Sequence, residues 1–326
     1  QASFGLEFAL LTTDHKPMNN NASDVITTLC SIRDYIRWGA SRFAEHQVFL
    51  GHGTVTPLDE AAAIVLHTLH QPYDLADNYL DSTLTFSERQ EVLNLIERRI
   101  VERKPSAYLT HEALFAGLSF YVDERVLVPR SPIAELIAER FEPWVDESEV
   151  FNVLDLCTGS GCIAIACAYA FPDARVDAVE LSEEALAVAA INVEKHDLAE
   201  QVVLFQSDLF SDLPAKAYDI IVSNPPYVAL AEWQNLPAEF HAEPAMGFKG
   251  GENGLDLVIR ILVDANAYLA EQGILVIEVG SSAEALQEMF PNIPFHWLEF
   301  EHGGDGVFLL TAQQVSTYHS LFASAL

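Results

Sequence analysis

The chain has 326 residues, half of them hydrophobic, which is enough for two domains with buried cores. Its formal net charge of −31 argues against binding to nucleic acid, because affinity for phosphates comes largely from Lys and Arg. We expect the acidic residues to form a solvated surface, as in salt-adapted proteins, although a basic protein partner is compatible with them. No stretch approaches the roughly 18 apolar residues of a membrane span, so we expect no membrane association.

The residues that could form metal sites or disulfides are scattered. No C-x-x-C pair occurs among Cys30, Cys157, Cys162 and Cys167. The last three fall in or just behind a glycine-rich loop and are interpreted as small buried hydrophobic residues. The histidines show no ligand spacing, so no metal is predicted.

Residues 1–17 precede Met18 and are predicted to be an extension or an expression remnant outside the folded domains. The apolar stretch 4–11 has no basic flank, which makes it a poor signal peptide.

Residues 18–107 are predicted to form a small helical domain. Its connecting segments contain helix-breaking residues but no group of catalytic residues, which favours a role in substrate recognition over one in chemistry. The predicted helices cover 24–45 with Ser23 or Asp24 as the cap, begin at Pro57 with Thr56 as the cap, and run from the capping box Thr85-x-x-Glu88 to about Lys104.

Residues 108–130 are predicted to be a β-hairpin that links two domains. The hydrophobic pattern changes here from helical to alternating, with Phe120 and Val122 before the polar run 123–125 and three apolar residues after it.

Residues 131–326 are predicted to be an α/β domain. Strands are expected near 151–156, 175–180, 201–206, 218–223 and 273–279, and helices near 161–170, 183–196, 253–271 and 282–290. This alternation is typical of a parallel sheet covered on both faces. Two further strands, 295–301 and 307–311, are joined through glycines and fit an antiparallel hairpin at the end of the chain.

A glycine loop follows the first predicted strand of this domain. Gly159 and Gly161 let the backbone approach a ligand closely, and the helix that begins near Cys162 offers its N-terminal N–H groups. The pattern Gly159-x-Gly161-x-x-Ala164 also satisfies the dinucleotide fingerprint, so it does not separate a nicotinamide cofactor from an adenosine one. Glu180 ends the next strand about twenty residues on, where a ribose diol would be bound, and we favour this role over that of a solvated loop acid.

The fourth predicted strand ends in Asn224-Pro225-Pro226-Tyr227. Two prolines make this tetrapeptide rigid, so it presents an amide acceptor and an aromatic wall at a fixed place. Taken alone, it could be an ordinary Pro-Pro turn. However, Gly159, Glu180, Asp208 and Asn224 all follow strand ends, and the carboxyl edge of an open parallel sheet is where ligands bind.

Together these motifs resemble a known family. Asp155 to Gly161, Glu180, Ser207-Asp208-Leu209 and Asn224 to Tyr227, in that order, resemble the class I S-adenosylmethionine-dependent methyltransferases that act on glutamine nitrogen. The run Val126 to Leu136 resembles the branch that methylates large-subunit ribosomal protein 3. It departs at 131–134 from the Pro-Arg-Pro-Glu-Thr-Glu run of the release-factor branch. The likeness extends from about residue 24 to the end.

The resemblance implies a Rossmann-like class I fold, S-adenosylmethionine as cofactor without a metal, and a set of site residues. It implies that the catalytic residues are Asn224, Pro225, Pro226 and Tyr227. The implied cofactor-binding residues are Asp155, Cys157, Thr158, Gly159, Ser160, Gly161, Glu180, Asp208, Leu209 and Asn224. The implied substrate contacts are Phe120, Arg130, Asn224, Pro225 and Tyr227. For Phe120, packing in the core is an equal interpretation. No role is assigned to Glu278, which lies at the end of the fifth strand.

The expected reaction is methylation of a glutamine side-chain amide in large-subunit ribosomal protein 3, in the cytoplasm. An amide nitrogen is a poor nucleophile, and acceptors at Asn224 and Pro225 would hold its two N–H bonds. The same chemistry on the Gly-Gly-Gln loop of release factors is one alternative. An adenine-amino methyltransferase is another, which the net charge disfavours. A nicotinamide dehydrogenase would have no use for Asn224 to Tyr227, and a non-catalytic scaffold would not need that tetrapeptide either.

Overall fold

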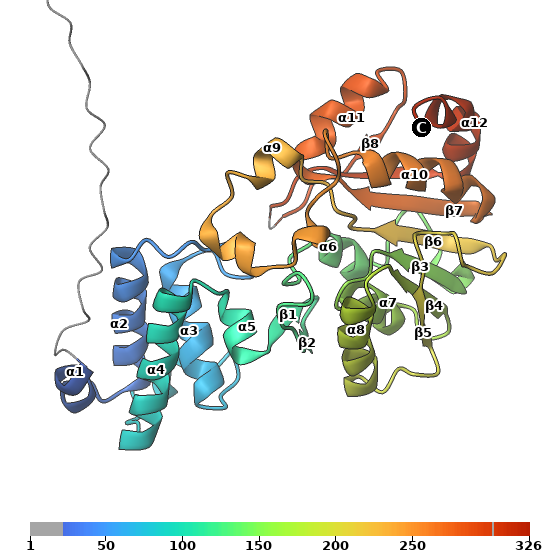
Figure 1. The fold of residues 1–326 in the computed structure, drawn as a ribbon. Coiled ribbons are helices and arrows are strands. Elements are labelled where there is room, and N and C mark those ends of the chain that lie inside the picture. Colours follow the sequence, from blue (N-terminus) through green and yellow to red (C-terminus); the bar gives the residue numbers. More distant parts are fainter. Residues whose placement is uncertain (1–21, 302) are drawn as a thin grey trace, which may run out of the picture.

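The computed structural model describes residues 22–301 and 303–326, so the predicted extension 1–17 lies outside the described residues. A helical region comes first in the chain, and an α/β region follows it (Figure 1). A short hairpin and a loop segment that carries α9 (Leu230–Trp233) lie between the two regions. Among the described residues, no helix is both long and apolar enough to cross a membrane.

The helical region holds α1 (Ala22–Thr28), α2 (Ile32–Glu45), α3 (Pro57–Thr68), η1 (Asp77–Tyr79), α4 (Phe86–Glu102) and α5 (Ser106–Thr110). The caps predicted at Thr56 and Thr85 are confirmed. The single helix predicted over 24–45 is wrong, because Ser31 and Asp34 form a capping box that begins a second helix. The core of the region is built from residues of α1 to α4, including Tyr35 and Ile96.

The segment 108–130 contains a hairpin, but its turn lies earlier in the chain than predicted. β1 (Ala113–Phe115) pairs antiparallel with β2 (Leu118–Phe120), and the turn between them is at 116–117. The polar run 123–125 is a local turn instead, in which the Asp123 carboxylate accepts from the backbone and the guanidinium of Arg125. The apolar residues 126–128 therefore form no strand.

The α/β region contains a sheet of seven strands in the order β5-β4-β3-β6-β7-β9-β8. The first five in the chain are parallel: β3 (Asn152–Leu156), β4 (Arg175–Glu180), β5 (Val202–Gln206), β6 (Tyr218–Ser223) and β7 (Leu269–Glu278). β9 (Val307–Thr311) runs antiparallel between β7 and β8 (His296–Trp297). The predicted parallel sheet with an antiparallel end is confirmed.

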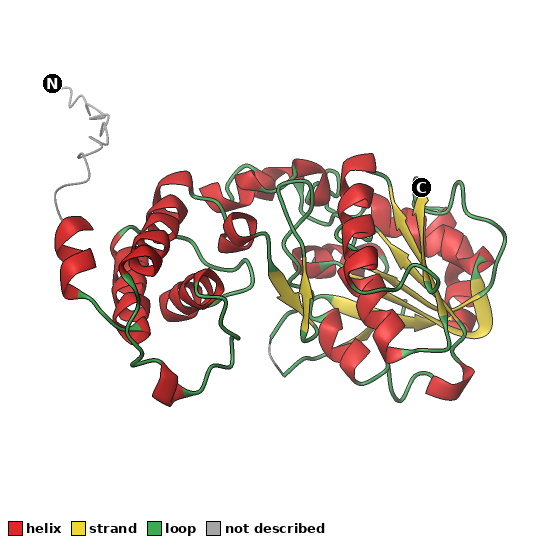
Figure 2. Ribbon diagram, turned by 90° about the horizontal axis from the view of Figure 1, so that it is seen from below, coloured by secondary structure: helices red, strands yellow, loops and turns green. Residues whose placement is uncertain are grey.

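Helices cover both faces of this sheet (Figure 2). One core cluster joins α6 (Ile133–Ala138) and α7 (Cys162–Ala170) to one face, with α8 (Glu183–Lys195) beside them. The other face packs against α10 (Asp256–Asp264), α11 (Ala283–Met289) and α12 (Ala312–Ala323). The short 3-10 turns are η2 (Glu147–Glu149), η3 (Ala238–Ala242), η4 (Ala245–Gly247), η5 (Ala265–Ala267) and η6 (Gly280–Ser282).

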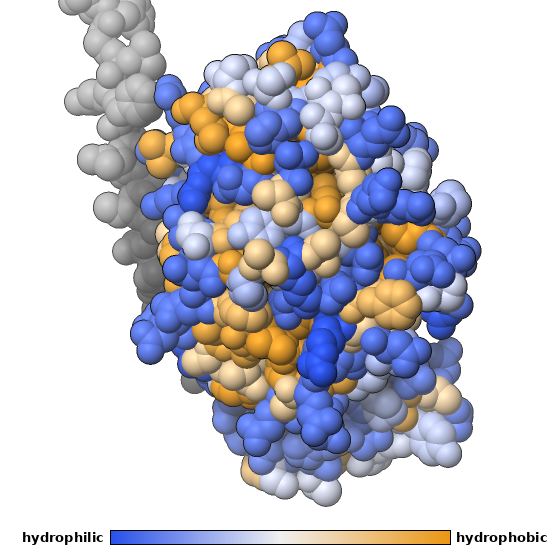
Figure 3. All heavy atoms as spheres, turned by 90° about the vertical axis from the view of Figure 1, so that its right-hand side faces the viewer, coloured by the Kyte–Doolittle hydropathy of each residue, from blue (hydrophilic) through white to orange (hydrophobic). Residues whose placement is uncertain are grey.

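Several helices of the α/β region also differ from the sequence prediction, in which α6, α9 and α12 are absent. The helix predicted over 253–271 is shorter, because Gly254 has a φ of 76° and the helix begins only at Asp256. The final helix α12 was not predicted, and Thr311 opens it with a capping box. On the face of the molecule shown in Figure 3, hydrophobic patches are separated by hydrophilic side chains.

Candidate active site

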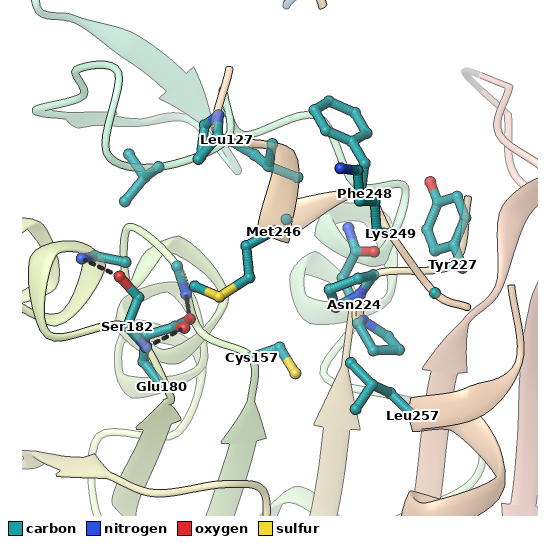
Figure 4. A pocket seen from close by; sticks show the side chains of 18 of the residues that line it. Leu127, Cys157, Glu180, Ser182, Asn224, Tyr227, Met246, Phe248, Lys249 and Leu257 are labelled. Atoms are coloured by element: carbon teal, nitrogen blue, oxygen red, sulfur yellow. Dashed lines mark hydrogen bonds between the residues drawn. The ribbon is translucent and has the colours of Figure 1, made fainter. Parts of the chain in front are cut away.

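A cavity of about 1010 Å³ opens at the carboxyl edge of the parallel strands. Its floor comes from the loops after β3, β4, β5 and β6, and the ends of those strands carry the predicted motifs. Its other sides come from residues 124–131 and from the segment after β6. In Figure 4, Glu180 and Cys157 lie on one side of the cavity, and Asn224 and Tyr227 lie on the other.

The tetrapeptide Asn224 to Tyr227 follows β6 directly, and the Ser223 Oγ donates to the carbonyl of Leu156 at 2.8 Å to fix the strand end. Asn224, Pro225, Pro226 and Tyr227 all line the cavity. Among the described residues, neither the side-chain amide of Asn224 nor the carbonyl of Pro225 has a hydrogen-bond partner. Two acceptors are thus available on one rigid segment of the cavity surface.

Tyr227 is held by a buried carboxylate that was given no role from the sequence. Its hydroxyl donates to Glu278 Oε1 at 2.8 Å, and Ser131 Oγ donates to Glu278 Oε2 at 2.5 Å. Burial is the main cause that raises the pKa of both Tyr227 and Glu278 above their ordinary values. Tyr227 therefore stays a neutral aromatic wall with a fixed ring position.

The glycine loop is tied to the strand beside it through Glu180. The Glu180 carboxylate accepts from the backbone N–H of Gly159 at 2.9 Å and of Ser182 at 3.0 Å. A carboxylate has about four acceptor sites, so this side chain, which lines the cavity, keeps capacity for further donors. Cys157, Thr158, Gly159 and Ser160 also line the cavity.

Asp155 and Gly161 support the loop from below and do not line the cavity. Asp155 Oδ2 accepts from Thr158 Oγ1 at 2.5 Å and from the N–H of Ala164 at 3.1 Å, and Oδ1 has no partner among the described residues. Complete burial raises the pKa of Asp155 to about 7. Gly161 is the N-cap of α7 with a φ of 81°.

Asp208 and Leu209 line the cavity beyond β5. Leu209 is buried with a positive φ of 53°, and it presents an apolar surface. Asp208 forms an ion pair with Arg260 of α10 at 2.9 Å, a partner that sequence reasoning missed because no local motif marks it.

Of the two predicted substrate contacts outside the tetrapeptide, Arg130 lines the cavity and Phe120 does not. Phe120 is fully buried against Phe115, so it is a core residue. The guanidinium of Arg130 is engaged by Glu243 in two hydrogen bonds of 2.9 Å and lies 5.5 Å from the ring centre of Phe240. Arg130 thus builds the cavity side rather than offering a free charge.

The segment between β6 and α10 contributes further lining residues that no motif pointed to, among them Phe240, Met246, Phe248 and Lys249. Met246 reaches toward the side of the cavity that holds Cys157 (Figure 4). These lining residues could not be predicted from the sequence because the segment is irregular. Only folding of the chain brings the segment over the strand ends.

Comparisons with known proteins show the family of the chain. A family model described as "Methyltransferase small domain" matches residues 135–245. The ribosomal protein uL3 glutamine methyltransferase of Francisella tularensis is 46% identical over 300 residues, which cover 92% of this chain and 96% of that protein. The protein of the same name from Bordetella pertussis is 49% identical over 300 residues, which cover 92% and 99%.

Among solved structures, the hMettl16 catalytic domain is similar with 18% identity and a TM-score of 0.48, over 69% of this chain and 80% of that one. The two curated relatives confirm the resemblance seen in the motifs, since the identity extends over nearly the whole of each. The chain belongs to the family of ribosomal protein uL3 glutamine methyltransferases.

Proposed function

We propose that the protein transfers a methyl group from S-adenosylmethionine to the side-chain amide nitrogen of a glutamine in ribosomal protein uL3. The observation that carries the proposal is the pair of unpartnered acceptors, the Asn224 amide oxygen and the Pro225 carbonyl, on a rigid segment of the cavity. Two relatives with 46% and 49% identity are named for this activity on uL3.

The residues on the β3 to β5 side of the cavity fit S-adenosylmethionine, which supplies a methyl group on a positively charged sulfur. The Glu180 carboxylate has acceptor capacity for the ribose hydroxyls, and the open backbone at Gly159 admits the methionine part. Asp208 would accept from the adenine amino group and Leu209 would offer an apolar surface to the ring, since both line the cavity. Asp155 and Gly161 shape the loop without touching the ligand.

The amide nitrogen of glutamine needs help because its lone pair is delocalised into the carbonyl. Asn224 and Pro225 each accept one N–H of this nitrogen, which fixes its direction toward the methyl group. The same oxygens stabilise the positive charge that develops during transfer. Proton loss follows without a strong base, because an N-protonated amide is very acidic. Tyr227 packs beside the reacting groups.

We further propose that residues 18–107 recognise the protein substrate, that 108–130 link the domains, and that 131–326 carry out the chemistry. The reaction takes place in the cytoplasm, where a basic ribosomal protein meets an enzyme with a net charge of −31. No metal and no direct nucleic-acid contact is part of the proposal.

Mass spectrometry of ribosomes from a strain without this protein tests the substrate. We expect uL3 to be lighter by one methyl group and release factors to be unchanged. The reverse pattern would assign the chain to the Gly-Gly-Gln substrate, and methylation of added DNA by the purified enzyme would assign it to adenine.

The catalytic assignment is tested with Asn224→Ala. Loss of one positioned electrostatic contact lowers kcat by about 100-fold or more, while binding of S-adenosylmethionine persists. Calorimetry and labelled methyl transfer measure the two effects separately. Activity within a few-fold of wild type would show that Asn224 does not hold the amide.

A further inference from the structure

Two buried carboxylates stand out in the wall segment, by which we mean residues 229–249 between β6 and α10. Glu239 is 2% exposed and Glu243 is 3% exposed. The wall segment supplies much of the cavity side opposite the strand ends, including Phe240, Met246 and Phe248. Neither carboxylate belongs to a residue that lines the cavity, and both accept hydrogen bonds from other parts of the chain.

Glu243 connects the wall segment to two other segments. It accepts from Arg130 twice and from the backbone N–H of Val128, each at 2.9 Å. Its Oε1 also lies 3.0 Å from Nε2 of His52 in the helical region, a close polar contact whose angles are poor for a hydrogen bond. Burial opposes ionisation, but His52 and Arg130 outweigh it and hold the pKa of Glu243 below its usual value.

Glu239 connects the wall segment to the helical region alone. Its Oε1 accepts from the backbone N–H of Phe49 at 3.0 Å and from Arg103 Nη1 at 3.0 Å. Arg103 also donates to the carbonyls of His46 and Gln47, so its guanidinium is fixed by the end of α2. Phe49 and Phe240 add an aromatic contact of 5.4 Å between ring centres.

The wall segment is therefore attached at two places. Its two ends are joined to each other after β6, where the N–H of Val228 donates to Phe248 O at 2.7 Å and the N–H of Gly250 donates to Val228 O. Its middle, with η3, reaches across to the helical region (Figure 1). Separating the middle from the helical region would leave the buried Glu239 without its cations and would remove His52 from Glu243, which would keep Arg130. An unpaired buried carboxylate is strongly unfavourable.

We infer that Glu239 and Glu243 are positioning residues that attach the wall segment to the helical region. Through them, the helical region sets the positions of Phe240 and Phe248 in the part of the cavity proposed to hold the glutamine amide. The inference rests on the proposed function. Its consequence is that recognition of uL3 by the helical region and the fit of its glutamine in the pocket are coupled through these contacts.

The pair of Glu239 and Arg103 gives the sharpest test, because Arg103 belongs to the helical region and does not line the cavity. We would compare full-length Glu239→Gln, Arg103→Gln and the double variant with wild type. Glu45→Gln serves as the control, since it removes the same charge from an exposed pair with Arg42. Steady-state kinetics with purified uL3, and calorimetry with S-adenosylmethionine, are the measurements.

Each single variant is expected to raise the KM for uL3 by about tenfold, with the double variant no worse than the singles because both remove one contact. We expect kcat to stay within about threefold and S-adenosylmethionine affinity within about twofold, since the strand-end loops are untouched. The control should match wild type. An unchanged KM, or a fall in kcat alone, overturns the inference. Should Glu239→Gln fail to fold, Arg103→Gln decides by itself.

Hydrogen exchange without substrate separates this inference from the proposed function. The amides of 238–248 and of Phe49 should exchange faster in Arg103→Gln, and the amides of β3 and β6 should not. Unchanged exchange in the wall segment refutes the attachment. If wild-type enzyme leaves uL3 unmethylated, the proposed function fails, and the exchange result still decides whether the wall segment is held from the helical region.

Discussion

Replacing Gly280 by Ala should displace Tyr227 from its place beside the reacting groups. Gly280 follows β7 and has a φ of 44°, a region that residues with a Cβ rarely adopt. An added Cβ would lie 2.4 Å from one ring carbon of Tyr227 and 2.8 Å from another. Non-bonded carbon atoms do not approach so closely, so either the ring of Tyr227 or the backbone at residue 280 must move.

The cost has two parts. A left-handed backbone conformation costs an L-residue roughly 1–2 kcal/mol. Moving the ring breaks the 2.8 Å hydrogen bond from Tyr227 to the buried Glu278, and hydrogen bonds to charged groups contribute about 1.5–3 kcal/mol. The variant should therefore lose roughly 2.5–5 kcal/mol of unfolding free energy. A displacement of about 1 Å at the site can lower the rate by about 100-fold.

Gly117→Ala is the matched control, because Gly117 has a φ of 75° and nothing within 4 Å of the added Cβ. It should lose only the roughly 1–2 kcal/mol of backbone strain and keep full activity. Urea denaturation and kcat with uL3 are measured for both variants. Equal losses of stability in the two variants, with kcat unchanged in Gly280→Ala, would refute the steric reasoning about Tyr227.

Glu180→Ala removes a charged acceptor and should weaken S-adenosylmethionine binding by about 1.5–3 kcal/mol in calorimetry, whereas NAD should not bind either protein; unchanged affinity would contradict the ribose role. Asp155 has a folded-state pKa of about 7, above its ordinary value, so its contribution to stability is complete below about pH 4 and is lost as the pH rises through 7. Thermal unfolding should show wild type gaining stability relative to Asp155→Asn from pH 8 to pH 5, and a constant difference would argue against the raised pKa. The KM for uL3 should rise between 0.05 and 0.3 M salt, roughly the range in which surface charges become screened, and a salt-independent KM would exclude electrostatic attraction.

The strand ends of the α/β region could be predicted because their signals are local. β3 and β6 are short strands of mostly buried apolar residues, and Gly159 or Pro225 after them marks where the chain must turn. Since parallel strands end at one edge, the order of motifs in the sequence already brought Gly159, Glu180 and Asn224 together. The cavity lies where that reasoning put it.

Features that depend on distant residues could not be predicted in this way. The fixed position of Tyr227 depends on Glu278, which lies 51 positions away in the sequence. It also depends on Ser131, which holds Glu278 from 147 positions away. In the sequence, Glu239 and Glu243 look like two exposed acids in an irregular stretch. Their burial is explained by pairing with the helical region and, for Glu243, with Arg130. Phe120 was a candidate substrate contact but is a buried core residue. The sequence does not separate these two roles for an aromatic residue near a predicted site.

The cations around the cavity give a local reason to favour a protein substrate over a nucleic acid. Three arginines that line it are each paired with a carboxylate: Arg125 with Asp123, Arg130 with Glu243, and Arg260 with Asp208. The fourth cation in the lining, Lys249, lies over the ring of Trp233 at 5.6 Å. A phosphate backbone entering the cavity would have to compete with these carboxylates for every arginine. A basic polypeptide would instead meet the acidic groups Glu184 and Glu232, which also line the cavity, so the local charges support the same substrate class as the net charge.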